Sequence, residues 1–248
     1  DIIITMVPDG PEVEQAVLGP NGVIEGVKKG SIVIDMSSIS PMVSQKVGAA
    51  LEAKGIDFLD APVSGGEPKA IDGTLAIMVG GKKDVFDKME PILKTMGSTV
   101  TLTGKIGAGN VTKLANQIMV AVNIAAMGEA LVLATKAGLD PEVVFNAVKA
   151  GLAGSTVLNV KAPMVYSRNF KPGFRVRLHQ KDLRNALLAA ESLKVSLPLT
   201  QGGSTLSLSY VVNFAAILVL GPSATVPIAI ASAWSQCTFR TQTRSPAH

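Results

Sequence analysis

The fold is decided by residues 31–63, which read SIVIDMSSISPMVSQKVGAALEAKGIDFLDAPV. The apolar, β-branched runs at 31–36 and 56–63 are typical of buried strands. Between them, residues 41–54 are predicted to form a helix, and Pro41 is a residue favoured in the first turn of a helix. Two successive strands joined by a helix usually pair in parallel, so this segment predicts one β-α-β unit of a parallel sheet.

The same alternation of strand and helix extends outward in both directions. Further strands are predicted over 1–7, 74–80 and 98–104, and further helices over 11–18 and 82–96. Continuous apolar strands that alternate with helices are typical of a parallel sheet covered by helices on both faces. From residue 107 onward the pattern is helical only, beginning with a long apolar helix over 109–136 that should be buried between partners. We therefore expect the α/β fold class, with a Rossmann-type parallel sheet domain followed by an all-helical domain.

Three more helices are predicted in the second half of the chain. Asp140 and Pro141 together are typical of a helix start. Another helix is expected after Ser155, and a third carries small and apolar residues at helical spacing over 183–190.

The composition excludes several classes of protein. Hydrophobic residues make up 47% and charged residues 17% of the chain, which excludes a disordered protein. The net charge is +4, but Lys and Arg are scattered among Asp and Glu, so no nucleic-acid partner is expected. The lone cysteine, Cys237, rules out an internal disulfide and suits a reducing compartment, so we expect a cytoplasmic location.

The composition changes abruptly near residue 201. Residues 201–248 contain no Asp, Glu or Lys, although the preceding residues hold all 19 acidic side chains. Three interpretations compete: a transmembrane helix, a buried C-terminal element and a tail that is out of frame. The apolar run over 210–220 is too short to span a membrane, and so abrupt a shift is rare inside a domain. We therefore favour the out-of-frame tail and expect no membrane partner; the predicted domains are 1–105, 106–200 and the tail 201–248.

A hydroxyl and two glycines follow the strand predicted over 56–63. These residues are Ser64, Gly65 and Gly66. Ligands bind at the carboxyl ends of strands in open parallel sheets, and paired glycines let backbone N–H groups approach an anion closely. The arrangement favours a cradle for a carboxylate, with a tight loop and an incidental serine as the alternative.

A lysine lies early on the long apolar helix, in the stretch GAGNVTKLANQ at 107–117. Asn116 and Gln117 are three and four residues after Lys113 and share its face of the helix. A lysine is costly to bury without a partner or a role, and burial lowers its pKa toward that of a proton donor near neutral pH. The alternative is a side chain whose ammonium reaches the surface.

A second lysine occurs in HQKDL at 179–183. Lys181 could contact a cofactor or a substrate, or Lys181 and Asp182 could form a solvated pair. The histidines His179 and His248 are not accompanied by a set of residues with metal-ligand spacing, so no metal is expected.

Together, DAPVSGG at 60–66, GAGNVTK at 107–113 and the KDL of HQKDL resemble the motifs of the β-hydroxyacid dehydrogenase family, in the same order. The resemblance covers residues 1–200 and implies an NADH- or NADPH-dependent reductase of small carboxylated aldehydes that forms a homo-oligomer. The variant GGEPKAIDGTLAIMVGG at 65–81 favours tartronate semialdehyde, which would be reduced to glycerate. Oxidation of 3-hydroxyisobutyrate, or reduction of another small semialdehyde, is the alternative.

The resemblance also implies roles for individual residues. Lys113 would donate a proton to the aldehyde oxygen, and the loop Ser64–Gly66 would hold the substrate carboxylate. The family has an asparagine four residues after the lysine; this chain has Gln117 there and Asn116 one place earlier, so either amide could orient the substrate. The implied cofactor contacts are Val7, Pro8, Ser38 and Lys181.

Two departures from the family pattern affect these expectations. The family begins with a glycine-rich β-α-β unit that holds the cofactor's pyrophosphate, and this sequence contains no such unit. Residues 201–248 also differ from the charged C-terminal helices of the family. We therefore expect an N-terminally truncated, incomplete dinucleotide-binding domain; a non-catalytic remnant that associates with full-length subunits is the alternative.

Overall fold

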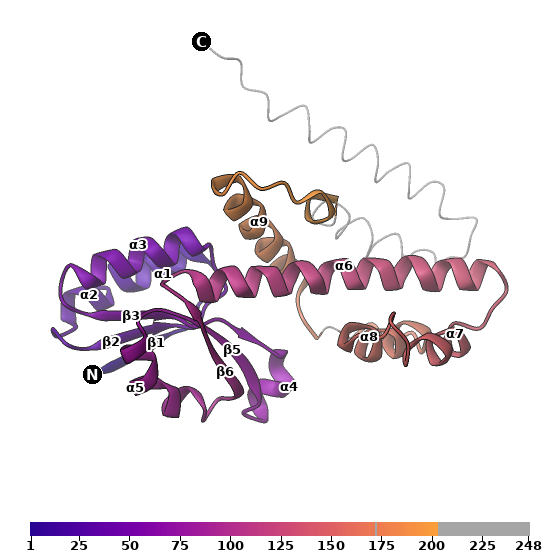
Figure 1. Cartoon of the computed structure of the whole chain (residues 1–248), viewed down its shortest axis with the longest axis horizontal. Coiled ribbons are helices and arrows are strands. Elements are labelled where there is room, and N and C mark those ends of the chain that lie inside the picture. The colour runs from indigo at the N-terminus through magenta and orange to yellow at the C-terminus, as the bar shows by residue number, and fades with distance from the viewer. Residues whose placement is uncertain (172, 203–248) are drawn as a thin grey trace, which may run out of the picture. The chain divides into compact units, whose positions relative to one another are not determined.

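The computed structural model describes residues 1–171 and 173–202, so all but the first two residues of the predicted tail lie outside the described residues. Within this part of the chain, a six-stranded sheet is followed mainly by helices (Figure 1). The strands are β1 (Ile2–Thr5), β2 (Ile32–Asp35), β3 (Asp57–Asp60), β4 (Val63–Ser64), β5 (Leu75–Gly80) and β6 (Gly97–Gly104).

The predicted α/β sheet is confirmed, with one difference in strand direction. Strands β1, β2 and β3 are parallel, and β5 and β6 are parallel to each other. However, β5 runs antiparallel to β3, which it meets at the pair Asp60 and Gly80. The direction reverses because the chain continues past β3 into β4, turns back through the helix at 66–71 and re-enters the sheet as β5, which pairs antiparallel with β4. The strand predicted over 56–63 is interrupted between β3 and β4, where Pro62 has no N–H to donate to a ladder.

Helices cover both faces of the sheet, as the sequence predicts. In the first part of the chain they are α1 (Gly10–Leu18), α2 (Val23–Gly26), α3 (Pro41–Glu52), α4 (Gly66–Ile71) and α5 (Lys83–Leu93). The side chains of β2 alternate between two apolar cores: Ile32 and Ile34 pack with residues of α5, and Val33 packs with residues of α1 and α3. The short helices α2 and α4 are not predicted, because a single turn carries too little periodicity to recognise.

The helices of the second half are α6 (Ala108–Lys136), α7 (Pro141–Val148), α8 (Thr156–Tyr166) and α9 (Val176–Ser192). The predicted start of α7 is confirmed, since the Asp140 side chain accepts a hydrogen bond from the backbone N–H of Glu142. The helix predicted after Ser155 is also confirmed, and the Ser155 hydroxyl accepts a hydrogen bond from Leu158 N–H.

The chain divides into two compact units. One comprises Asp1–Val122 and Ser167–Gln201, and the other includes Asn123–Tyr166. In the first unit, Leu114 of α6 packs against Ala186 and Ala189 of α9. In the second, Met127 and Leu131 lie in a core with residues of α7 and α8. The site described below lies entirely within the first unit.

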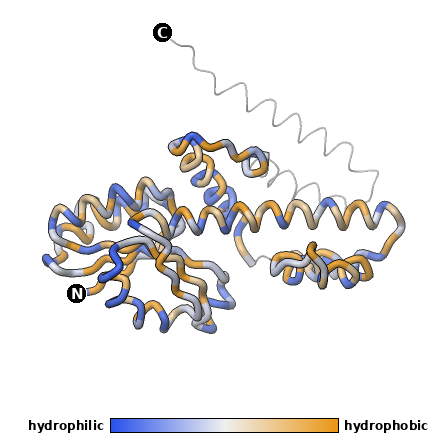
Figure 2. Tube along the Cα trace, in the orientation of Figure 1, coloured by the Kyte–Doolittle hydropathy of each residue, from blue (hydrophilic) through white to orange (hydrophobic). Residues whose placement is uncertain are grey.

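Helix α6 is mainly apolar, with scattered polar residues (Figure 2). By length and composition alone it is long and apolar enough to cross a membrane, as the core helix of a soluble protein can be. The prediction that it is buried between partners is not met within the described residues, where Met119 is 60% and Leu133 73% exposed. The reason is that apolar residues occur on all sides of α6, and the described elements cover only part of that surface.

Candidate active site

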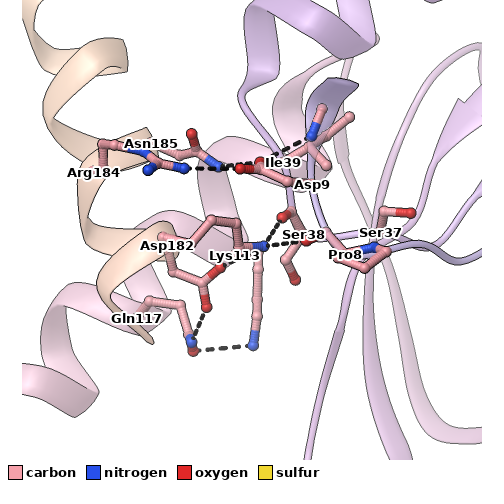
Figure 3. Close-up of polar contacts among 12 residues, drawn as sticks. Pro8, Asp9, Ser37, Ser38, Ile39, Lys113, Gln117, Asp182, Arg184 and Asn185 are labelled. Atoms are coloured by element: carbon pink, nitrogen blue, oxygen red, sulfur yellow. Dashed lines mark hydrogen bonds and ion pairs between the residues drawn. The ribbon is translucent and has the colours of Figure 1, made fainter. Parts of the chain in front are cut away.

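The candidate site lies where the parallel strands β1, β2 and β3 end, and it is completed by helices α6 and α9. The side chains that α6 and α9 contribute lie close together (Figure 3). Open α/β sheets bind ligands at the carboxyl ends of their strands. The sequence positions singled out above therefore lie where the architecture favours a ligand.

Lys113 is buried on the second turn of α6, so the alternative of a surface ammonium is wrong. The residue is 7% exposed, and its Nζ donates a hydrogen bond to Gln117 Oε1 at 3.0 Å. Burial lowers the pKa of Lys113 to about 8, although the negative charge of Asp182 acts in the opposite direction. An amine with this pKa holds a proton at neutral pH and releases it readily, which suits a general acid.

The Gln117 side chain uses both ends of its amide. Its Oε1 accepts hydrogen bonds from Lys113 and from Asn116 Nδ2, the latter at 2.9 Å. Its Nε2 donates to Asp182 Oδ2 on α9 at 2.5 Å (Figure 3). The structure thus brings Lys113, Asn116 and Gln117 together, and Asp182 fixes the orientation of the Gln117 amide.

The start of α9 is hydrogen-bonded to the loops that follow β1 and β2. The Lys181 ammonium donates to the backbone oxygen of Pro8 at 2.9 Å and to that of Ser38, and it forms an ion pair with Asp182 at 2.9 Å. The side chains of Lys181 and Asp182 are only 11% and 3% exposed, so the alternative of a solvated pair is wrong. Pro8, Ser38 and Lys181 therefore meet directly.

A second set of contacts holds the same helix. Asp9 follows Pro8 and accepts hydrogen bonds from Arg184 at 2.9 Å and from Asn185 Nδ2 at 3.1 Å (Figure 3). Val7 contacts the neighbouring loop through its backbone N–H, which donates to the Ser37 hydroxyl rather than to Ser38.

Ser64 ends β4, Gly66 begins α4, and Gly65 alone connects the two elements. Both glycines have positive φ angles, 137° at Gly65 and 68° at Gly66, which L-residues with side chains rarely adopt. The Lys69 side chain lies over Gly65, where an added Cβ would come within 2.6 Å of it. Within the described residues, the hydrogen bonds of Lys113, Asn116 and Gln117 do not involve this segment.

Several buried polar residues were not among the predicted site residues. Asp60 accepts hydrogen bonds from the first turn of α6, and burial raises its pKa to about 6. Asp35, at the end of β2, accepts hydrogen bonds from the hydroxyls of Thr5 and Ser37, and burial raises its pKa. His179 Nε2 lies 3.2 Å from the backbone oxygen of Gln117, and burial lowers its pKa. The signal for the two aspartates was available, since each ends an apolar strand at the ligand-binding edge.

No group of three or more His, Cys, Asp and Glu side chains that could hold a metal ion occurs within residues 1–171 and 173–202. The polar groups of the site are amines, amides, hydroxyls and single carboxylates, as expected for a site that binds an organic ligand.

The chain matches two known protein families along its sequence. Residues 1–104 match the family described as the NAD binding domain of 6-phosphogluconate dehydrogenase. Residues 107–212 match the family described as the NAD-binding domain of NADP-dependent 3-hydroxyisobutyrate dehydrogenase. The two matches together cover both the sheet and the helices α6–α9.

Individual relatives and structures agree with these matches. The chain is 48% identical over 200 residues to 2-hydroxy-3-oxopropionate reductase of Escherichia coli, covering 81% of this chain and 68% of that protein. It is 38% identical over 206 residues to 3-hydroxyisobutyrate dehydrogenase of Pseudomonas aeruginosa, covering 80% and 69%. The structure of Mycobacterium tuberculosis 3-hydroxyisobutyrate dehydrogenase with L-serine superposes with a TM-score of 0.79 at 30% identity, covering 86% and 75%.

Proposed function

The chain belongs to the β-hydroxyacid dehydrogenase family and is an NAD(P)-dependent oxidoreductase that acts on CH–OH groups, and from this premise we propose that it reduces tartronate semialdehyde (2-hydroxy-3-oxopropanoate) to glycerate. The observation that carries the proposal is the buried Lys113 amine, held by Gln117 near the carboxyl ends of the parallel strands. The 48% identity to a 2-hydroxy-3-oxopropionate reductase supports the choice of substrate.

The cofactor is NADH or NADPH, and we propose that its nicotinamide end binds beside the loops that follow β1 and β2. The loops after β1 and β2 place backbone oxygens and a lysine ammonium at the edge where open α/β sheets bind ligands. We assign its contacts in this chain to Val7, Pro8, Ser38 and Lys181. When bound, the nicotinamide supplies a hydride to the aldehyde carbon.

Lys113 donates the proton that the reduction also requires. As negative charge develops on the aldehyde oxygen, the Lys113 ammonium transfers a proton to it, so the aldehyde gains one hydride and one proton and becomes a primary alcohol. The amine that remains keeps its contact with Gln117 Oε1 and recovers a proton from solvent. Its lowered pKa favours this transfer, because an ammonium with an unperturbed pKa of 10.5 is a weaker acid.

The two amides beside Lys113 have different proposed roles. Gln117 is 5% exposed and already engages Lys113, Asn116 and Asp182, so we assign it the task of orienting the lysine. Asn116 is half-buried and can turn its amide toward a substrate, so we assign it the hydrogen bond that orients the substrate. Gln117 would act on the substrate only indirectly, through its hydrogen bond with Lys113.

The loop Ser64–Gly66 binds the substrate carboxylate in this proposal. Gly65 and Gly66 have no side chains and adopt positive φ angles, so an anion can approach the backbone N–H groups there closely. The Ser64 hydroxyl adds a further donor.

A second candidate is the 3-hydroxyisobutyrate reaction, which is favoured by the match of residues 107–212 and by the TM-score of 0.79. The two substrates differ at carbon 2, which carries a hydroxyl in tartronate semialdehyde and a methyl group in methylmalonate semialdehyde. A site that hydrogen-bonds a hydroxyl discriminates strongly against an analogue that lacks it.

The test is to measure kcat/KM of the purified chain for both semialdehydes, with NADH and with NADPH, by following the loss of reduced nicotinamide. We expect tartronate semialdehyde to be preferred by about tenfold or more. A preference for methylmalonate semialdehyde would establish the second candidate instead. Absence of turnover with both substrates and both nucleotides would overturn the proposed function.

We also propose that the protein works in the cytoplasm as a homo-oligomer, without nucleic acid or membrane. The exposed apolar residues Val111 and Met119 on α6 support association of subunits. Light scattering of the purified protein should give a mass that is a multiple of 25.6 kDa, whereas a mass of 25.6 kDa would contradict the oligomer.

A further inference from the structure

Asp60, the last residue of β3, makes contacts that the proposed reaction does not use. It is fully buried, and each of its carboxylate oxygens accepts one backbone hydrogen bond from the start of α6. Oδ1 accepts from Gly107 N–H at 2.7 Å, and Oδ2 accepts from Asn110 N–H at 2.8 Å. A side chain of the sheet therefore caps the helix that carries Lys113.

Helix α6 depends on this external cap because its own sequence provides none. The first N–H groups of a helix have no partner within the helix and are normally satisfied by the side chain of the residue before it. Here that residue is Gly107, which has no side chain. A carboxylate at this point also interacts favourably with the positive end of the helix dipole.

The packing around Asp60 leaves room for its carboxylate and little else. A Cβ at Gly109 would come within 2.5 Å of the Asp60 backbone oxygen and 2.9 Å of Oδ2. A Cβ at Gly80, which pairs with Asp60 in the sheet, would overlap Oδ1. Glycines at both positions thus allow β3, β5 and α6 to approach one another closely around one carboxylate.

Asn110 extends the connection to the loop after β2. Its Oδ1 accepts a hydrogen bond from Ile39 N–H at 2.9 Å, and its Nδ2 donates to the Ser44 hydroxyl at 3.1 Å. Ile39 directly follows Ser38, whose backbone oxygen binds Lys181. Lys113 lies three residues after Asn110, so it is one helical turn away from this bridge.

We infer that Asp60 is a positioning residue: with Asn110, it holds the first turn of α6, and therefore the Lys113 amine, against the ends of β2 and β3. The inference rests on the proposed role of Lys113 as proton donor. In Asp60→Asn, one of the two N–H groups would face the new NH₂ rather than an acceptor. The first turn of α6 would then shift, and the Lys113 amine would gain access to water.

The test is to titrate the Lys113 amine by its rate of acetylation with acetic anhydride between pH 6 and 11, measured by peptide mass spectrometry. The wild-type amine should titrate with a pKa of about 8. In Asp60→Asn we expect the pKa to rise by about one unit or more toward 10.5, because exposure to water removes the effect of burial. We expect kcat to fall about tenfold or more while KM changes less.

Asp57→Asn is the matched control, since it removes the same charge from the same strand. Asp57 is partly exposed and pairs with Lys82 rather than with α6. Its Lys113 titration and kcat should equal those of the wild type. If Asp60→Asn also leaves both unchanged, the inference is overturned.

Two further outcomes are decisive. Should Asp60→Asn fail to fold by circular dichroism, Asp60→Ser replaces it, since one hydroxyl oxygen cannot accept from both Gly107 N–H and Asn110 N–H. An unchanged Lys113 titration in that variant would overturn the inference. The acetylation measurement does not need turnover. If the wild type has no activity but Asp60→Asn shifts the Lys113 titration, the proposed function is refuted and the positioning role is supported. If the wild type turns over normally but Asp60→Asn does not shift the titration, the positioning role is refuted and the proposed function stands.

Discussion

The Gln117 amide donates a hydrogen bond to Asp182 across 2.5 Å, and this contact joins α6 to α9 beside the Lys113 amine. Asp182 in turn pairs with Lys181, which binds the backbone oxygens of Pro8 and Ser38. One hydrogen-bonded chain therefore runs from the proposed proton donor to the loops proposed to bind the nicotinamide. Its members are mutually dependent, because each buried polar group would otherwise be unsatisfied.

Replacement of Gln117 by leucine should destabilise the protein and reduce activity. The change leaves the Asp182 oxygen and the Lys113 ammonium without their buried partner, and a lost hydrogen bond to a charged group costs about 1.5–3 kcal/mol. Urea denaturation at pH 7 measures this loss of unfolding free energy. Gln15→Leu, at an exposed position of α1, is the control and should change stability by less than about 0.5 kcal/mol. Equal stability of the two variants would show that the Gln117 hydrogen bonds contribute nothing to the free energy of unfolding.

The rate of aldehyde reduction should fall as the pH rises above about 8. Lys113 must be protonated to act as the acid, and its pKa is lowered to about 8 by burial. In the reverse direction, alcohol oxidation requires the neutral amine, so its rate should rise through the same pH. Profiles of kcat/KM against pH for both directions measure this. An alkaline limb that begins only near 10.5 would mean that the titrating group is not a buried lysine.

Lys113→Met should stabilise the protein at pH 7. The pKa of Lys113 is about 8 in the folded protein and 10.5 in the unfolded chain. Burial of the charged ammonium therefore lowers the free energy of unfolding, and this cost is fully present below about pH 8. The shift corresponds to about 3 kcal/mol, from which loss of the Gln117 hydrogen bond subtracts about 1 kcal/mol. We therefore expect a gain of about 2 kcal/mol at pH 7 that shrinks as the pH approaches 10.5.

Urea denaturation of this variant at pH 7 and pH 9.5 measures the gain. Lys88→Met, at an exposed position of α5, controls for the general effect of replacing lysine by methionine and should show no such pH dependence. A destabilised Lys113→Met at pH 7 would contradict the energetic cost assigned to the buried ammonium.

Gly65→Ala should raise KM for the aldehyde substrate and lower stability. The φ angle of 137° is strained for alanine, and the added Cβ would collide with the Lys69 side chain. The expected loss is about 1–3 kcal/mol in unfolding free energy. Gly26→Ala is the matched control, because nothing lies within 4 Å of a Cβ there. If the two variants have the same KM, the glycine loop does not bind the carboxylate.

Periodicity predicted most of the fold because it reports which residues are buried within one element. It could not predict that β5 runs antiparallel to β3, since strand direction depends on how residues 61–74 turn the chain. Nor did spacing alone decide whether Lys113 is buried. That depends on α9, whose Asp182 lies 65 residues after Gln117.

The same limit applies to the residues that sequence reasoning missed. Asp60 and Asn110 lie within the quoted motifs, and Asp60 ends an apolar strand, but their partners are 47 to 71 residues away and spacing does not identify them. The alternative that Lys181 and Asp182 form a solvated pair was wrong for a related reason. Adjacent charges on a helix are usually exposed, but here α9 turns that face toward the strand ends. Motif order predicted which segments carry the site, whereas the hydrogen-bond partners required the tertiary structure.

The most direct measurement of the central claim is the reduction of tartronate semialdehyde at pH 7 by wild type, Lys113→Met and Lys113→Arg with saturating reduced nicotinamide. We expect Lys113→Met to lose about 10²–10⁴-fold in kcat, as for removal of a general acid. Lys113→Arg should be equally impaired, because a guanidinium keeps its proton at any pH of the assay. Unaltered kcat in Lys113→Met would contradict the account, since another group would then supply the proton.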